Sequence, residues 1–221
     1  MTKEQLLEKA IYIQYPLTYN VYKEYNIKNI HKLPLHKVGE MYDKWKYNSN
    51  HFTTEYHRNY SLPLLNKLLN FGYNKDDFTL KNKTSNGFDI SMLCPKAQYE
   101  YEIYELNNGQ FFDNINYNDL LTKSKANFIN ATDYHKLYIY PHKCSKITNK
   151  TINNGRLLYI SGDSQMIPDL PILSCYFKEI WYMDNRDNLT FNNKYKDIVF
   201  TDVLIELNYM EQKQYVDINF K

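Results

Sequence analysis

The strongest constraint on the fold lies in residues 156–186, where an apolar run leads directly into a glycine and then into a short helical segment. Arg156–Ser161 contains Leu-Leu-Tyr-Ile, which is typical of a buried strand. Gly162-Asp163-Ser164 follows at once, and a glycine at this point permits a tight turn that a side chain would resist. We therefore expect Ser164 at the C-terminal end of a strand and near the N-terminus of a helix.

The next residues predict that the same strand belongs to a βαβ unit. Leu170–Tyr176 can form an apolar helical face, and Lys178–Met183 predicts a second buried strand. A right-handed crossover makes two such strands parallel, so their ends lie at one edge of the sheet. We therefore expect Ser164 and the segment 184–186 at the same edge. A third apolar run, Ile198–Leu207, is long enough for another buried strand or for a strand with a bend.

This edge could support nucleophilic chemistry at Ser164. Unpaired backbone N–H groups converge at a helix N-terminus and favour a developing negative charge, as an oxyanion hole requires. A serine nucleophile also needs a base, and all six histidines precede Ser164 in the chain. They are His31, His36, His51, His57, His135 and His142. The simpler alternative for Ser164 is that it only caps the helix, since serine is a good N-cap residue.

Asp133 and His135 form the first candidate base pair. One residue separates them, so both side chains lie on one side of an extended segment, and the carboxylate could orient the imidazole. A neutral imidazole can take the hydroxyl proton near pH 7. Glu55-Tyr56-His57 has the same spacing and is the chief alternative, and His142 is a second alternative.

Three sequence segments resemble the SGNH (GDSL-like) hydrolase superfamily, namely Ile160-Ser-Gly-Asp-Ser-Gln-Met166, Tyr176-Phe-Lys-Glu-Ile180 and Tyr182-Met-Asp-Asn-Arg186. In that superfamily the serine of Gly-Asp-Ser is an acyl-transfer nucleophile. The common order places the Asp and His after the serine. The alginate O-acetyltransferase-like branch places an Asp-x-His pair before it, as Asp133-Tyr134-His135 stands here. Because triads depend on geometry and not on chain order, this inversion is chemically permitted.

The resemblance implies an α/β fold of the three-layer SGNH-like (flavodoxin-like) type, with a central, mainly parallel sheet and an N-terminal helical elaboration. It implies that Ser164 attacks the acyl donor, that His135 shuttles the proton and that Asp133 orients the imidazole. The groups assigned to the oxyanion or the substrate are Gly162, Asn185 and Arg186.

Two of these assignments have plain structural alternatives. Arg186 could form a salt bridge at the surface, and Asn185 could only make a turn at the end of the strand.

The function implied by the resemblance is the transfer or removal of an acyl group, acetyl above all, at a carbohydrate hydroxyl in surface-polysaccharide biosynthesis. Transferase and esterase both stay open. One alternative is a non-catalytic SGNH-like module that binds glycan or assists assembly, which the lack of a histidine after Ser164 supports. Another is a nucleotide-sugar-dependent glycosyltransferase, although no Asp-x-Asp metal motif is clear. No bound cofactor or metal is expected, and acetyl-CoA is a possible acyl donor.

The composition limits the possible partners and the compartment. With 221 residues, the chain suits one SGNH-like α/β domain over 1–221, with a mainly helical part over 1–75 and a sheet-containing catalytic part over 76–221. A net charge of +2, from 27 basic and 25 acidic residues, argues against a nucleic acid or an anionic membrane as partner. No apolar run approaches the length of a membrane span. The oligomeric state is left open.

Three isolated cysteines, at positions 94, 144 and 175, suit a reducing compartment, because they form neither a disulfide framework nor a zinc motif. The first ten residues are charged and periodic, and they lack the apolar core of a signal peptide. We therefore expect a cytoplasmic protein.

Local patterns predict several further elements. Helices are expected over residues 3–14, over Leu35–Tyr47 and over Ser61–Gly72, the last with a serine N-cap, an early proline and a glycine stop. Short strands are expected at Tyr99–Tyr104 and Leu137–Tyr140. The leucines expected in the core are Leu62, Leu65, Leu68 and Leu69. The carboxylates that we expect in solvent, at the margins of the apolar run 198–207, are Asp197, Asp202 and Glu206.

Overall fold

In the computed structural model of the chain, the described residues are 1–15, 29–33, 56–86, 98–106, 115–119, 125–127, 144–162, 165–166, 169–184 and 197–207. The chain divides into two compact units, which we describe separately. The first comprises Met1–Leu33 together with Phe111–Lys221, and the second comprises Pro34–Gln110. The predicted helix over residues 35–47, and the short strand predicted over 137–140, lie outside the described residues.

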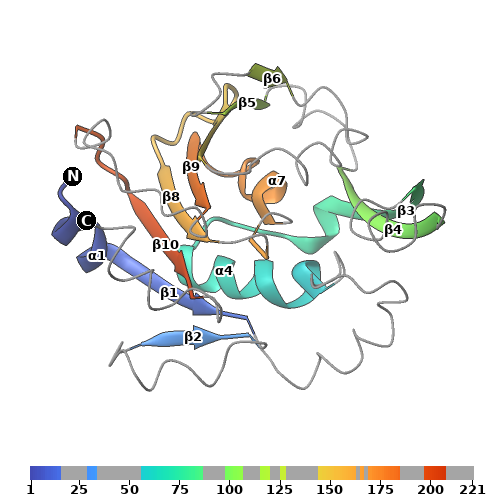
Figure 1. The fold of residues 1–221 in the computed structure, drawn as a ribbon, viewed down its shortest axis with the longest axis horizontal. Helices are drawn as coiled ribbons and strands as arrows, with labels where there is room; N and C mark the ends of the chain where they lie inside the picture. Colours follow the sequence, from blue (N-terminus) through green and yellow to red (C-terminus); the bar gives the residue numbers. More distant parts are fainter. Residues whose placement is uncertain are drawn as a thin grey trace. The chain divides into compact units, whose positions relative to one another are not determined.

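The first unit is built on a sheet whose eight described strands have the order β2-β1-β10-β8-β9-β7-β5-β6 (Figure 1). From β2 to β9 every neighbouring pair is parallel, whereas β7, β5 and β6 are added antiparallel. The strands are β1 (Ala10–Gln14), β2 (Ile30–Lys32), β5 (Ile115–Asp119), β6 (Lys125–Asn127), β7 (Cys144–Asn149), β8 (Leu157–Gly162), β9 (Glu179–Asp184) and β10 (Asp202–Glu206). The protein therefore has the predicted α/β fold with a central, mainly parallel sheet.

The predicted βαβ unit is present. β8 and β9 are parallel neighbours, joined by a segment that includes the short helix α7 (Leu170–Leu173). This helix is shorter than the predicted 170–176, because residues 174–176 form turns. Only the second half of the apolar run 198–207 forms a strand, β10, and every residue of β10 after its first is buried.

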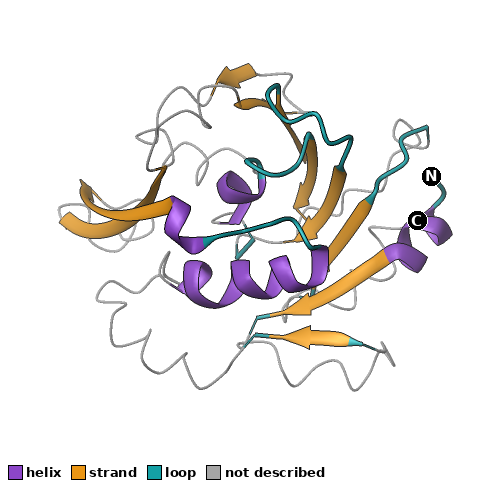
Figure 2. Cartoon of the chain, turned by 180° about the vertical axis from the view of Figure 1, so that it is seen from behind, coloured by secondary structure: helices purple, strands orange, loops and turns teal. Residues whose placement is uncertain are grey.

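The N-terminal helix ends earlier than its periodicity predicted, and a strand follows it directly (Figure 2). α1 (Lys3–Lys9) begins with a capping box, in which Thr2 and Gln5 exchange side-chain-to-backbone hydrogen bonds. From Ala10 the chain is extended, because residues 10–13 pair in parallel with residues 203–206 of β10. The part predicted as mainly helical, residues 1–75, thus contributes β1 and β2 to the sheet.

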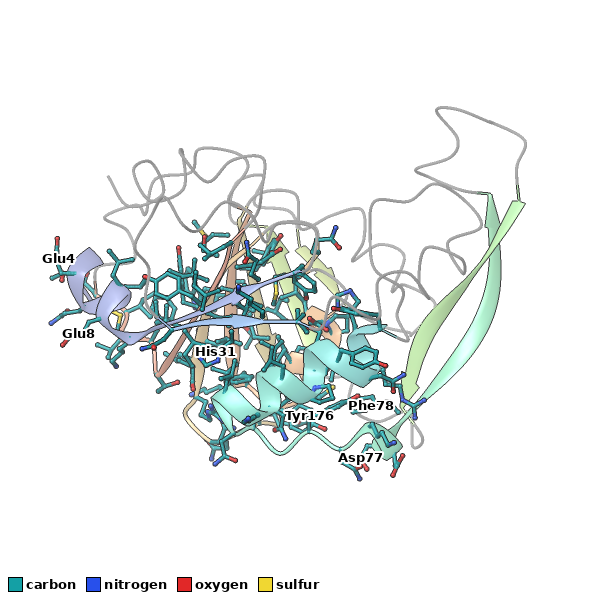
Figure 3. All side chains as sticks on the ribbon, turned by 90° about the horizontal axis from the view of Figure 1, so that it is seen from below. Glu4, Glu8, His31, Asp77, Phe78 and Tyr176 are labelled. Carbon is teal, nitrogen blue, oxygen red and sulfur yellow. The ribbon has the colours of Figure 1, made fainter. Side chains whose placement is uncertain are left out.

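Helical segments contact both faces of this sheet. On one face, Leu6 of α1 packs in a cluster with Tyr159, Val203 and Ile205, and we call this side the α1 face. Side chains alternate along a strand, so Ile160, Leu204 and Glu206 point to the opposite side. We call that side the α7 face, because residues of the segment leading into α7 contact it. Glu4 and Glu8 lie on the exposed side of α1 (Figure 3).

The second unit has one main helix and a β-hairpin-like pair of strands. Its described elements are the π-helix η4 (His57–Ser61), α4 (Leu62–Leu69), the 3-10 helix η5 (Lys75–Asp77), β3 (Phe78–Asn86) and β4 (Gln98–Leu106). β3 and β4 pair antiparallel, and β4 includes the predicted strand at residues 99–104.

The ends of α4 differ from the prediction. Ser61 has helical dihedral angles and makes no capping hydrogen bond, since the π-helix η4 already precedes it. At the other end, Asn70 adopts the left-handed conformation and ends the helix before Gly72. The Asn66 side chain then accepts three backbone N–H groups, those of residues 71–73. Of the leucines expected in the core, Leu62, Leu65 and Leu69 are buried and Leu68 is half-buried.

Candidate functional site at the C-terminal edge of the parallel strands

The candidate site lies at the C-terminal edge of the parallel strands, where β8 ends. In the register of β8 and β9, Gly162 lies opposite Asp184, so both strands end at the same edge as predicted. The chain passes from β8 to β9 on one side and then to β10 on the other side of β8. The C-terminal end of β8 is therefore a topological switch point, where open α/β sheets bind their ligands.

Gly162 is needed here because of crowding and not because of its dihedral angles. Gly162 is the last residue of β8. Its φ is not positive, because the glycines with positive φ in the described chain are Gly72 and Gly155. A Cβ atom added to Gly162 would lie 2.7 Å from Cγ of Met166 and 2.9 Å from Oε2 of Glu206. The sequence predicted a glycine required by a turn, whereas the structure shows a glycine required by close contact on the α7 face.

Glu206 contradicts the prediction of a solvated carboxylate. Its residue exposure is 1%, and it is the last residue of β10, which is paired with β1 on one side and β8 on the other. Burying a carboxylate is costly unless polar groups surround it, so such residues are concentrated where a protein needs them. Its Oε2 atom lies beside the Gly162 backbone, directly before the predicted nucleophile.

Asp202, at the other end of β10, was also predicted in solvent, and the structure shows it only partly exposed, in an ion pair. Arg156 donates to both of its carboxylate oxygens, from Nε at 3.1 Å and from Nη2 at 2.5 Å. The Arg156 guanidinium also lies 4.5 Å from the centre of the Phe177 ring. This ion pair joins the beginnings of β8 and β10, away from the candidate site. Asp197 is exposed, as predicted.

A second buried carboxyl group contacts the segment that leads from β8 into α7. Asp169 is fully buried and accepts a hydrogen bond from the Tyr15 hydroxyl at 3.0 Å. The same hydroxyl lies 3.7 Å from Sδ of Met166, the residue that packs on Gly162. Tyr15 follows β1 directly, so this contact links the end of β1 to the beginning of α7.

Tyr182 contacts Gly162 from the neighbouring strand β9. Its ring is fully buried in β9, and its hydroxyl donates to the carbonyl oxygen of Gly162 at 3.3 Å. On the α1 face of the same edge, Ser161 is buried, and its hydroxyl makes no hydrogen bond within the described part of the chain.

Sequence reasoning missed all of these polar residues, Glu206, Asp169, Tyr15 and Tyr182. The signal available in the sequence was a polar side chain inside or at the end of an apolar run.

Most of the predicted site residues cannot be placed, because they lie outside the described residues. They are Asp133, His135, Ser164, Asn185 and Arg186, together with the alternatives Glu55 and His142. Gly162 is described, and so is His57, the other alternative base. His57 is fully buried and begins the π-helix η4, and its ring meets the Tyr56 ring edge-on at 6.1 Å. Single-turn π-helical segments are frequent at functional sites.

Neither a metal site nor a membrane span is found in what the structure describes. No three His, Cys, Asp or Glu side chains of the described ranges are grouped so that they could hold a metal ion. Within the same ranges, no helix combines the length and the apolar character needed to cross a bilayer.

The strand order and the switch point together define an α/β protein of flavodoxin-like sheet order. No protein-family model and no curated protein sequence matches the chain. Solved structures do share its fold. A DHHW family protein from Eubacterium siraeum DSM 15702 is 16% identical, with a TM-score of 0.58 over 92% of this chain and 79% of that one.

Bacillus cereus PatB1 is a second structural neighbour, in two solved forms. The form with a sulfonyl adduct is 14% identical, with a TM-score of 0.64 over 92% of this chain and 83% of that one. The other form of PatB1 is also 14% identical, with a TM-score of 0.60 over 99% of this chain and 88% of that one. At these identities the likeness establishes the shared fold.

Proposed function

We propose that this protein transfers an acyl group, acetyl above all, to or from a carbohydrate hydroxyl, with Ser164 as the nucleophile. The observation that carries the proposal is the position of β8, whose end lies at the switch point and continues through Gly162 into Asp163 and Ser164. The neighbour solved as a sulfonyl adduct supports the proposal, because a sulfonyl group is captured by a nucleophilic side chain.

The proposed reaction has two steps. In the first, Oγ of Ser164 attacks the acyl carbonyl carbon, an imidazole takes the hydroxyl proton, and the leaving group departs with that proton. In the second, the hydroxyl of a sugar, or water in an esterase, attacks the acyl-enzyme. That nucleophile gives its proton to the imidazole, and Ser164 takes a proton back as its bond to the acyl carbon breaks. A carboxylate, Asp133 in the sequence prediction, holds the imidazole in the productive orientation.

The oxyanion of each tetrahedral intermediate needs donors on the same edge. The backbone amide of Ser164 is one proposed donor, and Asn185 or Arg186 is the other. The register of Gly162 opposite Asp184 supports this pairing, because the two chain segments leave adjacent strands at the same level.

Two histidines compete for the role of the base. We number the parallel strands in chain order from β8, as 1 (β8), 2 (β9) and 3 (β10), and continue from the N-terminus with 4 (β1) and 5 (β2). Their spatial order, β9-β8-β10-β1-β2, is then 2-1-3-4-5, which is the flavodoxin-like order. The segment after β2 therefore corresponds to the C-terminal segment that carries the Asp and His in the common SGNH order. Glu55 and His57 follow β2, whereas Asp133 and His135 follow β6. Chain order thus supports His57, and the resemblance to the alginate branch supports His135.

The acyl donor and the compartment complete the proposal. We keep the alginate O-acetyltransferase-like branch, surface-polysaccharide biosynthesis and a cytoplasmic location as proposals from the sequence. In that compartment acetyl-CoA would supply the acetyl group.

Covalent labelling tests the nucleophile. The purified protein is incubated with a fluorophosphonate probe and, separately, with p-nitrophenyl acetate, beside the variants Ser164→Ala and Ser161→Ala. We expect labelling to disappear in Ser164→Ala and to persist in Ser161→Ala, a matched control three residues upstream. Labelling that survives Ser164→Ala would remove Ser164 as the nucleophile. A wild-type protein that neither labels nor hydrolyses the ester would favour a non-catalytic glycan-binding module.

The same assay chooses the base. Alanine variants of His57 and His135 are compared, each after its folding has been checked by circular dichroism. Loss of the base should slow acylation by about a hundredfold or more, while the other variant should stay close to wild type.

A further inference from the structure

The backbone at the end of β8 is contacted from both neighbouring strands. From β9, the buried hydroxyl of Tyr182 donates to the carbonyl oxygen of Gly162 at 3.3 Å. Tyr182 lies opposite Ile160 in the register of β8 and β9. The Tyr182 side chain extends along the same face of the sheet to Gly162, two residues beyond Ile160. From β10, Oε2 of Glu206 lies 2.9 Å from the position that a Gly162 Cβ would occupy.

Gly162 needs such contacts more than another residue would. Glycine has the widest choice of backbone conformations, so a glycine before a nucleophile does not by itself fix the direction of the chain. The peptide group is planar, so a hydrogen bond that holds the Gly162 carbonyl also fixes the N–H group on the other side of the same peptide bond. Holding this one peptide group therefore fixes the direction in which the chain leaves Gly162 toward Ser164.

We propose that Tyr182 and Glu206 are positioning residues for acyl transfer, because together they hold the peptide group that follows Gly162. Tyr182 holds the carbonyl oxygen through its hydroxyl, and Glu206 closes the space beside the Gly162 Cα atom. Both side chains are buried, at 0% and 1% exposure, so they act through the backbone and do not touch the substrate. This inference rests on the proposed function of Ser164.

Tyr182→Phe tests the hydroxyl with the smallest change. The ring keeps its place in the core, and only the hydrogen bond to Gly162 is lost. Ser174→Ala is the matched control, because the buried Ser174 hydroxyl also donates to a backbone carbonyl, that of Pro171, at 2.6 Å. Both variants lose one buried hydroxyl-to-carbonyl bond, but only Tyr182→Phe loses it at the candidate site.

We expect Tyr182→Phe to lower kcat for p-nitrophenyl acetate and the rate of fluorophosphonate labelling by about tenfold, the equivalent of one hydrogen bond. KM should change by less than about twofold, because the substrate does not contact Tyr182. Ser174→Ala should keep both rates within about twofold of wild type, at a similar loss of stability. Equal rates in Tyr182→Phe and Ser174→Ala would overturn the inference.

Glu206→Gln and Glu206→Ala give the second measurement. Glutamine keeps the size of the side chain and one oxygen, so labelling should stay within about threefold of wild type, whereas alanine should lose about tenfold or more. If alanine labels as fast as glutamine, Glu206 has no positioning role. If the wild-type protein itself is not labelled, the proposed function is contradicted. If the wild type is labelled normally and the variants are labelled equally fast, only the positioning role is contradicted.

Discussion

Replacing Gly162 with alanine should destabilise the protein through a defined steric conflict. The new Cβ atom would lie 2.7 Å from Cγ of Met166, where ordinary contact begins at 3.4 Å, so one of them must move by 0.7 Å. Met166 and Glu206 are buried at 0% and 1% exposure, so neither has open space to enter.

The expected loss follows from two opposing effects. Overpacking a well-packed core costs about 1–3 kcal/mol. Replacing a glycine stabilises by about 0.4–1 kcal/mol, because it restricts the unfolded chain. The overlap of up to 0.7 Å with two buried neighbours places the overpacking cost in the upper half of its range, so the free energy of unfolding should fall by about 1–2.5 kcal/mol.

A double-mutant cycle separates this conflict from other effects of losing a glycine. The free energy of unfolding is measured in urea, with tryptophan fluorescence as the signal. In a Met166→Ala background, which removes the Cγ atom, the cost of Gly162→Ala should fall by at least about 1 kcal/mol. Gly155→Ala is the matched control, because its φ is +70° and nothing lies within 4 Å of the new Cβ. Its cost arises from backbone strain and should be the same in both backgrounds.

Two results would refute the steric argument. One is a Gly162→Ala protein as stable as the wild type. The other is a cost of Gly162→Ala that does not change when Met166 is shortened.

Three further predictions concern interactions outside Gly162. Tyr15→Phe removes the donor to the buried carboxyl group of Asp169 and should lower the free energy of unfolding in urea by about 1.5–3 kcal/mol. Arg156→Gln breaks a partly exposed, two-point ion pair with Asp202 and should cost about 1 kcal/mol, with a smaller loss when the urea titration is repeated in 1 M salt. Burial raises the pKa of the Cys175 thiol, so at pH 8 it should stay protonated and unreactive in the folded protein. Mass spectrometry after a thiol-reactive label should detect modification of Cys175 only after denaturant is added, and labelling in the native state would contradict its burial.

The βαβ unit could be predicted from the sequence because its information is local. Inside β8 and β9 the residues Leu-Leu-Tyr-Ile and Ile-Trp-Tyr-Met form continuous apolar runs, and strands that are buried on both faces of a parallel sheet require such runs. A helical connection between two neighbouring strands makes the strands parallel and the crossover right-handed in almost all proteins, so both features are predictable.

β1 was missed because its information is not local. Residues 3–14 have a helical period, and the helix does form as far as Lys9. The next residues, Ala-Ile-Tyr-Ile, pair instead with β10, about 190 residues further along the chain. Tertiary pairing overrides a local preference of this kind, and no pattern within the segment indicates it.

The burial of Glu206 follows from the same non-local pairing, which explains why the sequence predicted a solvated carboxylate at this position. In the sequence, a glutamate at the end of an apolar run is most simply a solvated margin. It becomes a buried group only because β10 is a central strand, enclosed by β1 from the N-terminus of the chain and by β8. An edge strand with the same sequence would leave its last carboxylate in water. The position of a strand within its sheet thus decides whether a terminal polar residue is solvated or buried, and in this protein β10 is a central strand because β1 pairs beside it.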